Sequence, residues 1–398
     1  MAVITGDRDL KRAHSPASLL YRPEVRQAFY QVVLVVLLVA LFYMLVTNTA
    51  TNLRKQNIAS GFGFIGRTAG FDVSQSLIAY DNSSTYGRAF LVGLLNTMLV
   101  AGLGILIATT LGFIIGIARL SSNWLVARLA AVYVELIRNV PPLLQLFFWY
   151  FAVLKALPLP RQSYSFGGAF LNVRGLYLPE PIPEPGFDFV WLALLFGIGA
   201  SIAVYFAARR RQMRTGQQFP VLWTSLALIV LLPLAVFFAL GQPLVLDYPE
   251  LKGFNFRGGM VLQPEFVALL LGLSIYTASY IAEIVRSGIA GVPKGQQEAA
   301  LAIGLSKGQA LRLVIVPQAM RIIIPPLSSQ FLNLTKNSSL GVAIAYPDLV
   351  SVWAGTVLNQ TGQAVEVILV TMGVYLTLSL LTSAFMNWFN KRMALVER

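Results

Sequence analysis

Long apolar runs without a charged residue constrain the fold of this chain more than any other feature of the sequence. The clearest run, residues 29–49, is rich in valine and leucine and lies between Arg26 and Arg54. About 18 or more such residues predict a membrane-spanning helix, because a backbone in hydrocarbon must satisfy its hydrogen bonds within the segment. Only 12% of the residues are charged, against about 25% in a soluble domain. We therefore expect an all-α integral membrane protein.

About eight segments qualify as membrane spans when hydropathy and flanking charges are taken together. They cover residues 29–49, 90–118, 141–154, 187–207, 219–240, 266–288, 322–335 and 367–389. The third holds Pro141 and Pro142, which predict a kink or break. The seventh is short and contains Pro325 and Pro326, so we expect a re-entrant or broken helix there. Small residues let helices approach closely in membranes, and the second span contains Gly93, Gly102, Gly104, Gly112 and Gly116.

The basic residues lie between the apolar runs, which decides how the net charge of +13 is interpreted. A clustered basic face would indicate nucleic-acid binding, whereas Lys and Arg spread over alternate loops indicate membrane topology. With the N-terminus inside, the inside segments hold about twice as many Lys and Arg residues as the outside segments. We expect both termini in the cytoplasm, no nucleic-acid partner, and an extended external loop at residues 157–185, which are rich in proline.

The sequence lacks the residues that metal, redox, nucleotide-binding and catalytic sites require. The chain has no cysteine and one histidine, His14, so we expect no metal site, no redox centre and no resident cofactor. The sequence contains no Gly-x-x-x-x-Gly-Lys-Ser/Thr motif, so we expect no P-loop for ATP on this chain. Paired carboxylates at catalytic spacing are missing as well, which argues against an enzyme.

The interval after the sixth span predicts a helix, a glycine turn and a second helix. Glu298, Ala299 and Ala300 favour a compact helix with small residues on its surface. Gly304 permits the positive backbone φ angle that ends such a helix, and Ser306 after Leu305 is suited to cap the next one. An element of this kind outside the hydrocarbon is suited to docking a partner. The alternative is an ordinary connecting loop.

This interval resembles the EAA loop of permease subunits in binding-protein-dependent ABC importers. The Glu-Ala-Ala triplet, the glycine at the family spacing and the Ile315-Val316-Pro317 ending are all present. A second segment, from Glu135-x-x-Arg138 to Pro141-Pro-Leu-Leu-Gln145, resembles the polar-amino-acid branch of that family, although Asn139-Val140 stands where many members have Gly-Thr. A third segment, Glu283-Ile-Val-Arg286-Ser-Gly288, is also typical of the branch.

The resemblance implies a type I importer permease core with a two-helix insertion. The resemblance covers the transmembrane domain at 88–390. Hydropathy and charge predict a cytoplasmic segment at 1–28, a first helix and periplasmic loop at 29–87, and a cytoplasmic tail at 391–398. The insertion falls at about 157–263 and the coupling loop at about 290–321.

The implied partners are a dimer of ATPase subunits that hold ATP and Mg, a second, non-identical permease, a periplasmic amino-acid-binding protein and membrane lipid. The implied substrate is an L-amino acid carried across the bacterial inner membrane. Glu298, Ala299, Ala300, Gly304, Leu305 and Ser306 would then couple the permease to its ATPase.

Polar residues near the spans have functional and structural interpretations. Asp348 is expected either to face the α-amino group of the substrate, or to serve as a helix cap or an interfacial anchor beside Pro347. Donors for a substrate carboxylate could come from Lys336, Asn337, Ser338 and Ser339, for which ordinary helix-break chemistry is the alternative. We expect structural ion pairs or gate elements from Glu135, Arg138, Glu283 and Arg286. An ion-coupled secondary transporter is the rival class, but it would not need the loop around Glu298.

Overall fold

The computed structural model describes residues 23–55 and 60–393. Helix α2 (Pro23–Lys55) contains the first predicted span, and its large apolar side chains from Phe29 to Val46 are exposed. Most of the N-terminal segment at 1–28 and of the tail at 391–398 lies outside the described residues, so the prediction that both termini are cytoplasmic stays a prediction.

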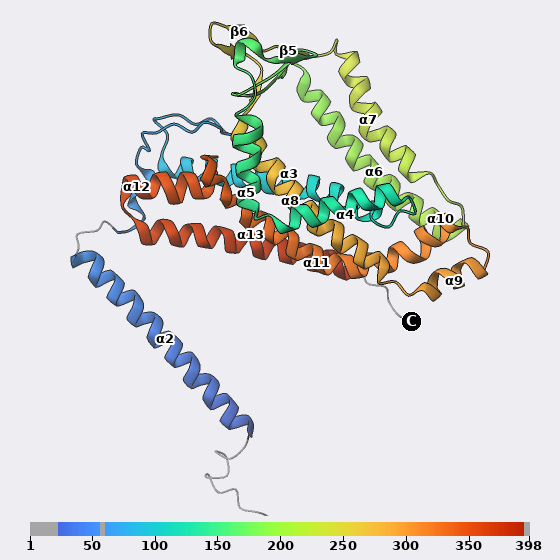
Figure 1. Cartoon of the computed structure of the whole chain (residues 1–398), viewed down its shortest axis with the longest axis horizontal. Coiled ribbons are helices and arrows are strands. Elements are labelled where there is room, and N and C mark those ends of the chain that lie inside the picture. Colours follow the sequence, from blue (N-terminus) through green and yellow to red (C-terminus); the bar gives the residue numbers. More distant parts are fainter. Residues whose placement is uncertain (1–22, 56–59, 394–398) are drawn as a thin grey trace, which may run out of the picture.

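Four long helices form the bundle that carries the buried core. They are α3 (Tyr86–Ala118), α8 (Pro264–Ala290), α11 (Val316–Asn337) and α13 (Ala364–Met393). The most extensive contact is that of α3 with α8, and α11 packs against both α8 and α13 (Figure 1). Leu269, Ile281 and Ile323 are buried where these helices meet. The predicted second, sixth and eighth spans are confirmed.

Glycines explain how closely α3 approaches α8. A Cβ atom at Gly112 would lie 2.6 Å from the Cβ of Ile281, and one at Gly116 would lie 2.7 Å from the carbonyl oxygen of Ala282. Gly93 and Gly104 similarly face Leu349 and Leu334, as the sequence predicted, whereas Gly102 faces open space.

The third predicted span is shorter than the others. Helix α4 (Trp124–Asn139) ends where Val140 adopts an extended conformation before Pro141, and α5 (Pro142–Phe147) continues into the π-helical segment η2 (Phe148–Leu154). Proline disfavours the helical conformation of the residue that precedes it, and this explains why the helix breaks at Val140. Among the described residues, seven helices are long and apolar enough to cross a membrane, and 142–154 is a shorter apolar helix.

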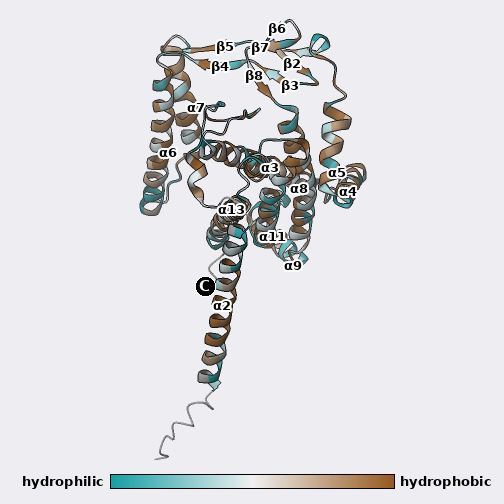
Figure 2. Ribbon diagram, turned by 90° about the vertical axis from the view of Figure 1, so that its left-hand side faces the viewer, coloured by the Kyte–Doolittle hydropathy of each residue, from teal (hydrophilic) through white to brown (hydrophobic). Residues whose placement is uncertain are grey.

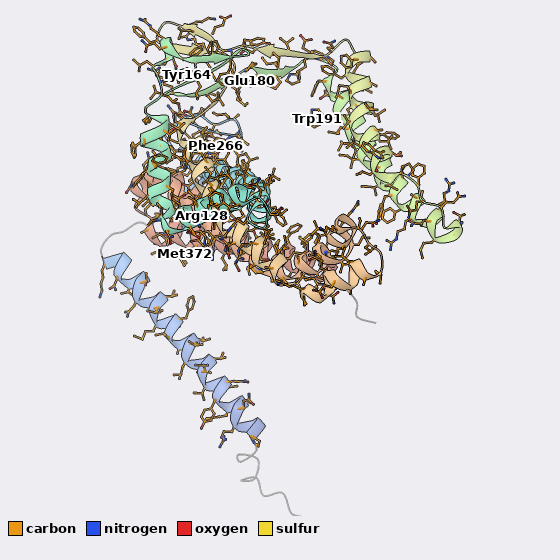
Figure 3. The ribbon with its side chains drawn as sticks, turned by 45° about the vertical axis from the view of Figure 1, so that its right-hand side comes forward. Arg128, Tyr164, Glu180, Trp191, Phe266 and Met372 are labelled. Atoms are coloured by element: carbon orange, nitrogen blue, oxygen red, sulfur yellow. The ribbon has the colours of Figure 1, made fainter. Side chains whose placement is uncertain are left out.

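Helices α6 (Phe187–Thr215) and α7 (Val221–Ala239) form a separate hairpin and confirm the fourth and fifth spans. Their extensive helix contact is with each other. Figure 2 shows the hairpin standing apart from the bundle, with strands joining the two. In Figure 3, Tyr164 and Glu180 lie in this strand layer, Phe266 in the bundle and Trp191 on the hairpin.

The prediction of an irregular loop at 157–185 is wrong, because four of the eight strands found in the described part of the chain lie there. Strands β1 (Tyr164–Phe166), β2 (Ala169–Asn172) and β3 (Gly175–Leu178) form an antiparallel sheet with β8 (Met260–Leu262). Two further pairs join β4 (Glu180–Pro183) to β5 (Leu244–Asp247) and β6 (Glu250–Lys252) to β7 (Asn255–Arg257). Proline is tolerated on sheet edges, so the proline-rich composition does not prevent these short strands.

The seventh span is not short and is not broken at Pro325 and Pro326, so this part of the prediction is wrong. Helix α11 runs through Pro325 and Pro326, and the helical segment extends over Lys307–Ile344. Packing against α8 and α13 holds the helix where proline removes backbone bonds. The predicted interruption at the polar run is present, because the α-helix gives way there to the 3₁₀ segment η5 (Ser338–Ile344).

The remaining helical segments are short. They are η1 (Phe62–Gly66), η3 (Pro160–Gln162), α9 (Lys294–Ala302), α10 (Lys307–Ala310), η4 (Leu311–Ile315), η6 (Val350–Val357) and α12 (Leu358–Thr361).

Candidate functional site

The predicted helix–glycine–helix element is present at the end of α8. Helix α9 ends at Ala302, and Gly304 has a φ of 88°. The amide of Gly304 donates to the carbonyl of Leu301 (3.0 Å), and the amide of Leu305 donates to that of Ala300 (3.2 Å). These bonds satisfy the last carbonyls of α9 in the manner of a helix C-cap. The glycine turn is confirmed.

The second helix begins with the predicted serine cap. The Ser306 hydroxyl accepts from the amide of Gln309 (3.4 Å), and the Gln309 side chain accepts from the amide of Ser306 (2.9 Å). Such a reciprocal capping box satisfies two amides that a helix start leaves unpaired. The chain then continues through η4 into α11, so a displacement of this element would be transmitted to a bundle helix.

The element presents one anchored face and one exposed face. Ala300 and Ala310 are buried, whereas Glu298, Ala299, Gly304 and Ser306 are exposed. Ile303, beside the turn, is 78% exposed. The backbone of the turn and the side chain of Ile303 are therefore both accessible at the surface of this element.

A polar cleft of about 430 Å³ lies among α3, α4 and α8. Its lining brings together most of the residues for which the sequence predicted structural or gate roles, and adds others: Arg119, Val134, Glu135, Arg138, Asn139, Tyr280 and Glu283. Arg286 joins them through Glu283, because its Nη2 lies 2.6 Å from Oε1 of that carboxylate.

The ion pairs of this cleft differ from the pattern that sequence spacing suggests. Glu283 pairs with both Arg286 and Arg119. The predicted pairing of Glu135 with Arg138 is absent among the described residues, since the Arg138 guanidinium lies over the Tyr280 ring at 4.9 Å. Sequence analysis missed Arg119, because its partner is 164 positions away. The one sequence signal for Arg119 is its position directly after the apolar span that ends at Ala118.

Comparisons with known proteins identify the family of this chain. The model of the family described as "Binding-protein-dependent transport system inner membrane component" matches residues 210–395. The chain is 56% identical over 382 residues to the general L-amino acid transport system permease protein AapQ of Rhizobium johnstonii, covering 96% of this chain and 95% of the relative. This chain belongs to that family of inner-membrane permeases.

Other relatives of this permease extend over nearly the whole chain. The putative amino-acid ABC transporter permease protein YhdX of Escherichia coli is 53% identical over 377 residues, covering 94% of this permease and 96% of the relative. A solved structure, "Crystal structure of an amino acid ABC transporter with histidines", matches 77% of this permease and 95% of that chain at 21% identity, with a TM-score of 0.46.

The predicted substrate-path residues differ in burial. Asp348 is fully buried, and its Oδ1 accepts from the amide of Ser351 at 2.8 Å, so it caps the helical turn that begins at Leu349. Its other oxygen, Oδ2, has no hydrogen-bond partner among the described residues. Beside it, the amide of Leu349 donates to the Thr97 hydroxyl (2.9 Å). The cap that the sequence left as an alternative is thus present, while a role in the substrate path stays a prediction.

The polar run before Asp348 bonds back to its own helix. The Ser338 hydroxyl donates to the carbonyl of Thr335 (2.8 Å), and the Ser339 hydroxyl donates to that of Lys336 (2.7 Å). Lys336 is exposed, Asn337 is half-buried and Ser338 is buried. Helix-break bonding therefore occupies both hydroxyls as donors, and each hydroxyl oxygen retains acceptor capacity.

Proposed function

We propose that this permease is a membrane-spanning subunit of an ATP-driven L-amino-acid importer. The main support is its 56% identity over 96% of the chain with a general L-amino acid permease, combined with an exposed helix–glycine–helix element on the bundle. Both termini and this element would lie in the cytoplasm, as the distribution of Lys and Arg indicates. The strands at the other end of the bundle would then lie in the periplasm.

The coupling loop is proposed to dock on a separate ATPase subunit. Glu298, Ala299, Ala300, Gly304, Leu305 and Ser306 would form the contact, and ATP and Mg would be bound by the ATPase dimer. Because α10 continues through η4 into α11, closure of the ATPase dimer would displace a helix of the bundle. Alternating access follows if each ligand prefers one of the two states.

A second, non-identical permease and a periplasmic binding protein would complete the importer. The substrate path is proposed to pass Lys336, Asn337, Ser338, Ser339 and Asp348. On the opposite side, Glu135, Arg138, Glu283 and Arg286 would hold the cytoplasmic end of the bundle closed, with Arg119 as an added partner of Glu283.

Uptake of radiolabelled L-amino acids into proteoliposomes tests the proposal. The vesicles would contain this permease, its genomic neighbours and the binding protein, with ATP inside. We expect uptake to require every component. Glu298→Lys should reduce uptake to background, whereas the matched charge reversal Glu180→Lys on strand β4 should preserve coupling to ATP. Uptake by this chain alone, driven by an ion gradient, would instead identify a secondary transporter.

The backbone of the loop offers a second comparison. Gly304→Val should reduce ATP-coupled uptake strongly, because a β-branched residue at a φ of 88° is strained. Gly304→Asn should retain more activity, because asparagine tolerates this region. Equal activity of the two variants would contradict the proposed role of the turn.

A further inference from the structure

The basic end of the α6–α7 hairpin carries an uncompensated positive charge. Arg209, Arg210, Arg211 and Arg214 lie in the last two turns of α6. No acidic residue occurs between Asp188 and Asp247 in the sequence. The hairpin itself therefore supplies no carboxylate to neutralise these guanidinium groups.

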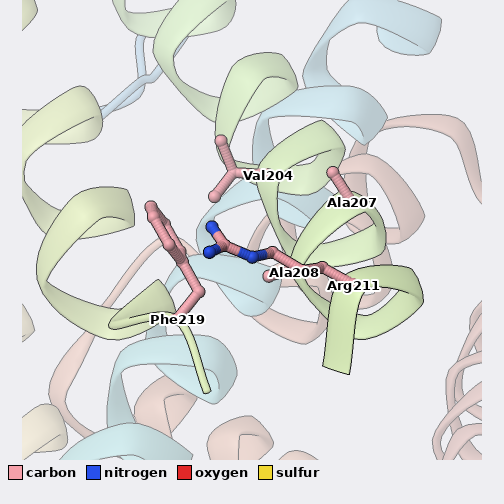
Figure 4. Close-up of a pocket in the computed structure, with 5 residues that line it drawn as sticks. All are labelled: Val204, Ala207, Ala208, Arg211 and Phe219. Carbon is pink, nitrogen blue, oxygen red and sulfur yellow. The ribbon is translucent and has the colours of Figure 1, made fainter. Parts of the chain in front are cut away.

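A cleft of about 200 Å³ lies between α6 and the start of α7 at this end (Figure 4). Its lining consists of Val204, Ala207, Ala208, Arg211 and Phe219. Four of these residues are apolar, and Arg211 is the charged one. The guanidinium of Arg211 is positioned by a hydrogen bond from its Nη2 to the side-chain oxygen of Gln217 (2.7 Å).

Helix length places the cleft at the boundary between hydrocarbon and headgroups. A bilayer core of about 30 Å corresponds to about 20 helical residues, which α6 provides from Phe187 to about Phe206. Ala207 and the arginines then lie at headgroup level. Along α6, the cleft is apolar on the membrane side and cationic toward the headgroups, which is the order of groups in an anionic phospholipid.

We propose that this cleft binds one anionic phospholipid. The phosphate accepts hydrogen bonds from the Arg211 guanidinium, and the first methylenes of an acyl chain lie against Val204, Ala207 and Phe219. Arginine suits this role because its planar guanidinium binds phosphate oxygens in pairs. The positive charges of the other three arginines also attract the phosphate. This attraction outweighs the repulsion from the partial negative charge at the C-terminus of α6.

A generic topological role of the arginines does not account for the cleft. Orientation in the membrane depends on the number of basic residues near a span, and it requires neither an apolar recess beside them nor a guanidinium held by Gln217. The lipid would also fasten the hairpin, which makes its extensive helix contact only within itself.

Native mass spectrometry of the purified full-length chain tests the proposal. The protein would be exposed to equal amounts of phosphatidylglycerol and phosphatidylcholine, and the retained lipids would be counted. We expect the parent to retain phosphatidylglycerol preferentially. Arg211→Gln should reduce this preference about fivefold, since one basic residue near an anionic surface contributes about that factor.

Matched variants separate a built site from general attraction. Arg392→Gln removes one exposed charge from the basic end of α13 and should leave the preference unchanged. Ala207→Trp fills the apolar half of the cleft and should reduce retention with all arginines intact. Equal losses in Arg211→Gln and Arg392→Gln, or no preference in the parent, would overturn the proposal. Displacement of the lipid by excess inorganic phosphate would also overturn it, because it would indicate a simple anion site.

Discussion

The bundle and the α6–α7 hairpin both consist of apolar helices, but different contacts hold them in place. In the bundle, α3 packs along α8 so closely that Gly112 leaves no space for a methyl group beside Ile281. In the hairpin, large side chains such as Phe196 and Trp223 are 69% and 70% exposed, and α7 has no buried residue. The bundle is therefore specified by its own packing, whereas the hairpin depends on one helix seam and on the strands that join it to the bundle.

Disrupting the α3–α8 contact should give the largest effect. Gly112→Val places a side chain against Ile281 and should destabilise the chain by about 1–3 kcal/mol or more, the usual cost of overpacking. Thermal unfolding in detergent, followed by intrinsic fluorescence, measures the change.

Gly102→Val is the matched control, because it changes the same residue type in the same helix where the side chain meets open space. Its unfolding temperature should stay close to that of the parent. If both variants lost the same stability, helix propensity rather than packing would explain the glycines.

Removing the carboxylate of Glu283 should have the next largest effect. Glu283→Gln leaves Arg119 and Arg286 without their shared anion, and it should cost about 1–2 kcal/mol for a half-buried pair. Glu135→Gln serves as the control, because Glu135 makes no ion pair among the described residues. Comparable losses in the two variants would show that the cleft depends on total charge instead of these specific pairs.

Disrupting the seam of the hairpin should change global stability less than either of these substitutions. A Cβ atom at Gly197 would clash with the backbone carbonyl oxygen of Leu228, whereas one at Gly199 would face open space. Gly197→Val should separate α6 from α7 and accelerate proteolysis at residues 216–220. The unfolding of the bundle should shift by less than about 0.5 kcal/mol, as for substitutions remote from a core.

Gly199→Val should leave the proteolysis rate unchanged. A large loss of bundle stability in Gly197→Val would show that the two regions fold as one unit, and would remove the distinction between them.

The smallest effect concerns pH and the loop that packs on the end of α3. Hydrogen bonds from Ser83 and Ser84 hold the pKa of Asp81 below its ordinary value. Stabilisation of this turn is therefore present at neutral pH and decreases as the pH falls below about 4, through the folded-state pKa. Amide exchange at Ser83 should accelerate over that range in the parent and show little pH-linked change in Asp81→Asn, after correction for intrinsic exchange.

Much of the bundle could be predicted because its determinants are local. An apolar run such as 266–288 specifies its own helix, and Gly304 and Ser306 specify a turn and a cap through their own backbone and hydroxyl chemistry. Features that depend on distant partners could not be predicted. Arg119 finds Glu283 only after α3 has packed on α8, and β3 needs β8, which lies beyond the whole hairpin.

Proline accounts for two wrong predictions, and the reason is the same in both. At residues 157–185 it suggested an irregular loop, and in α11 it suggested a helix break. Sequence propensity reflects the amide donor that proline lacks, but it does not include the neighbouring elements that stabilise the segment. These neighbours are β5 beside Pro181 and the helices packed against α11 at Pro325.

The antiparallel pairing of β3 with β8 allows the segment between them to change in length during evolution. Leu176 lies opposite Leu262, so the long excursion between them, hairpin included, leaves and returns at almost the same place. The entropy of closing an excursion grows only logarithmically with its length. Lineages could therefore lengthen, shorten or exchange the hairpin without moving the bundle helices on either side, and its sequence should diversify faster than theirs.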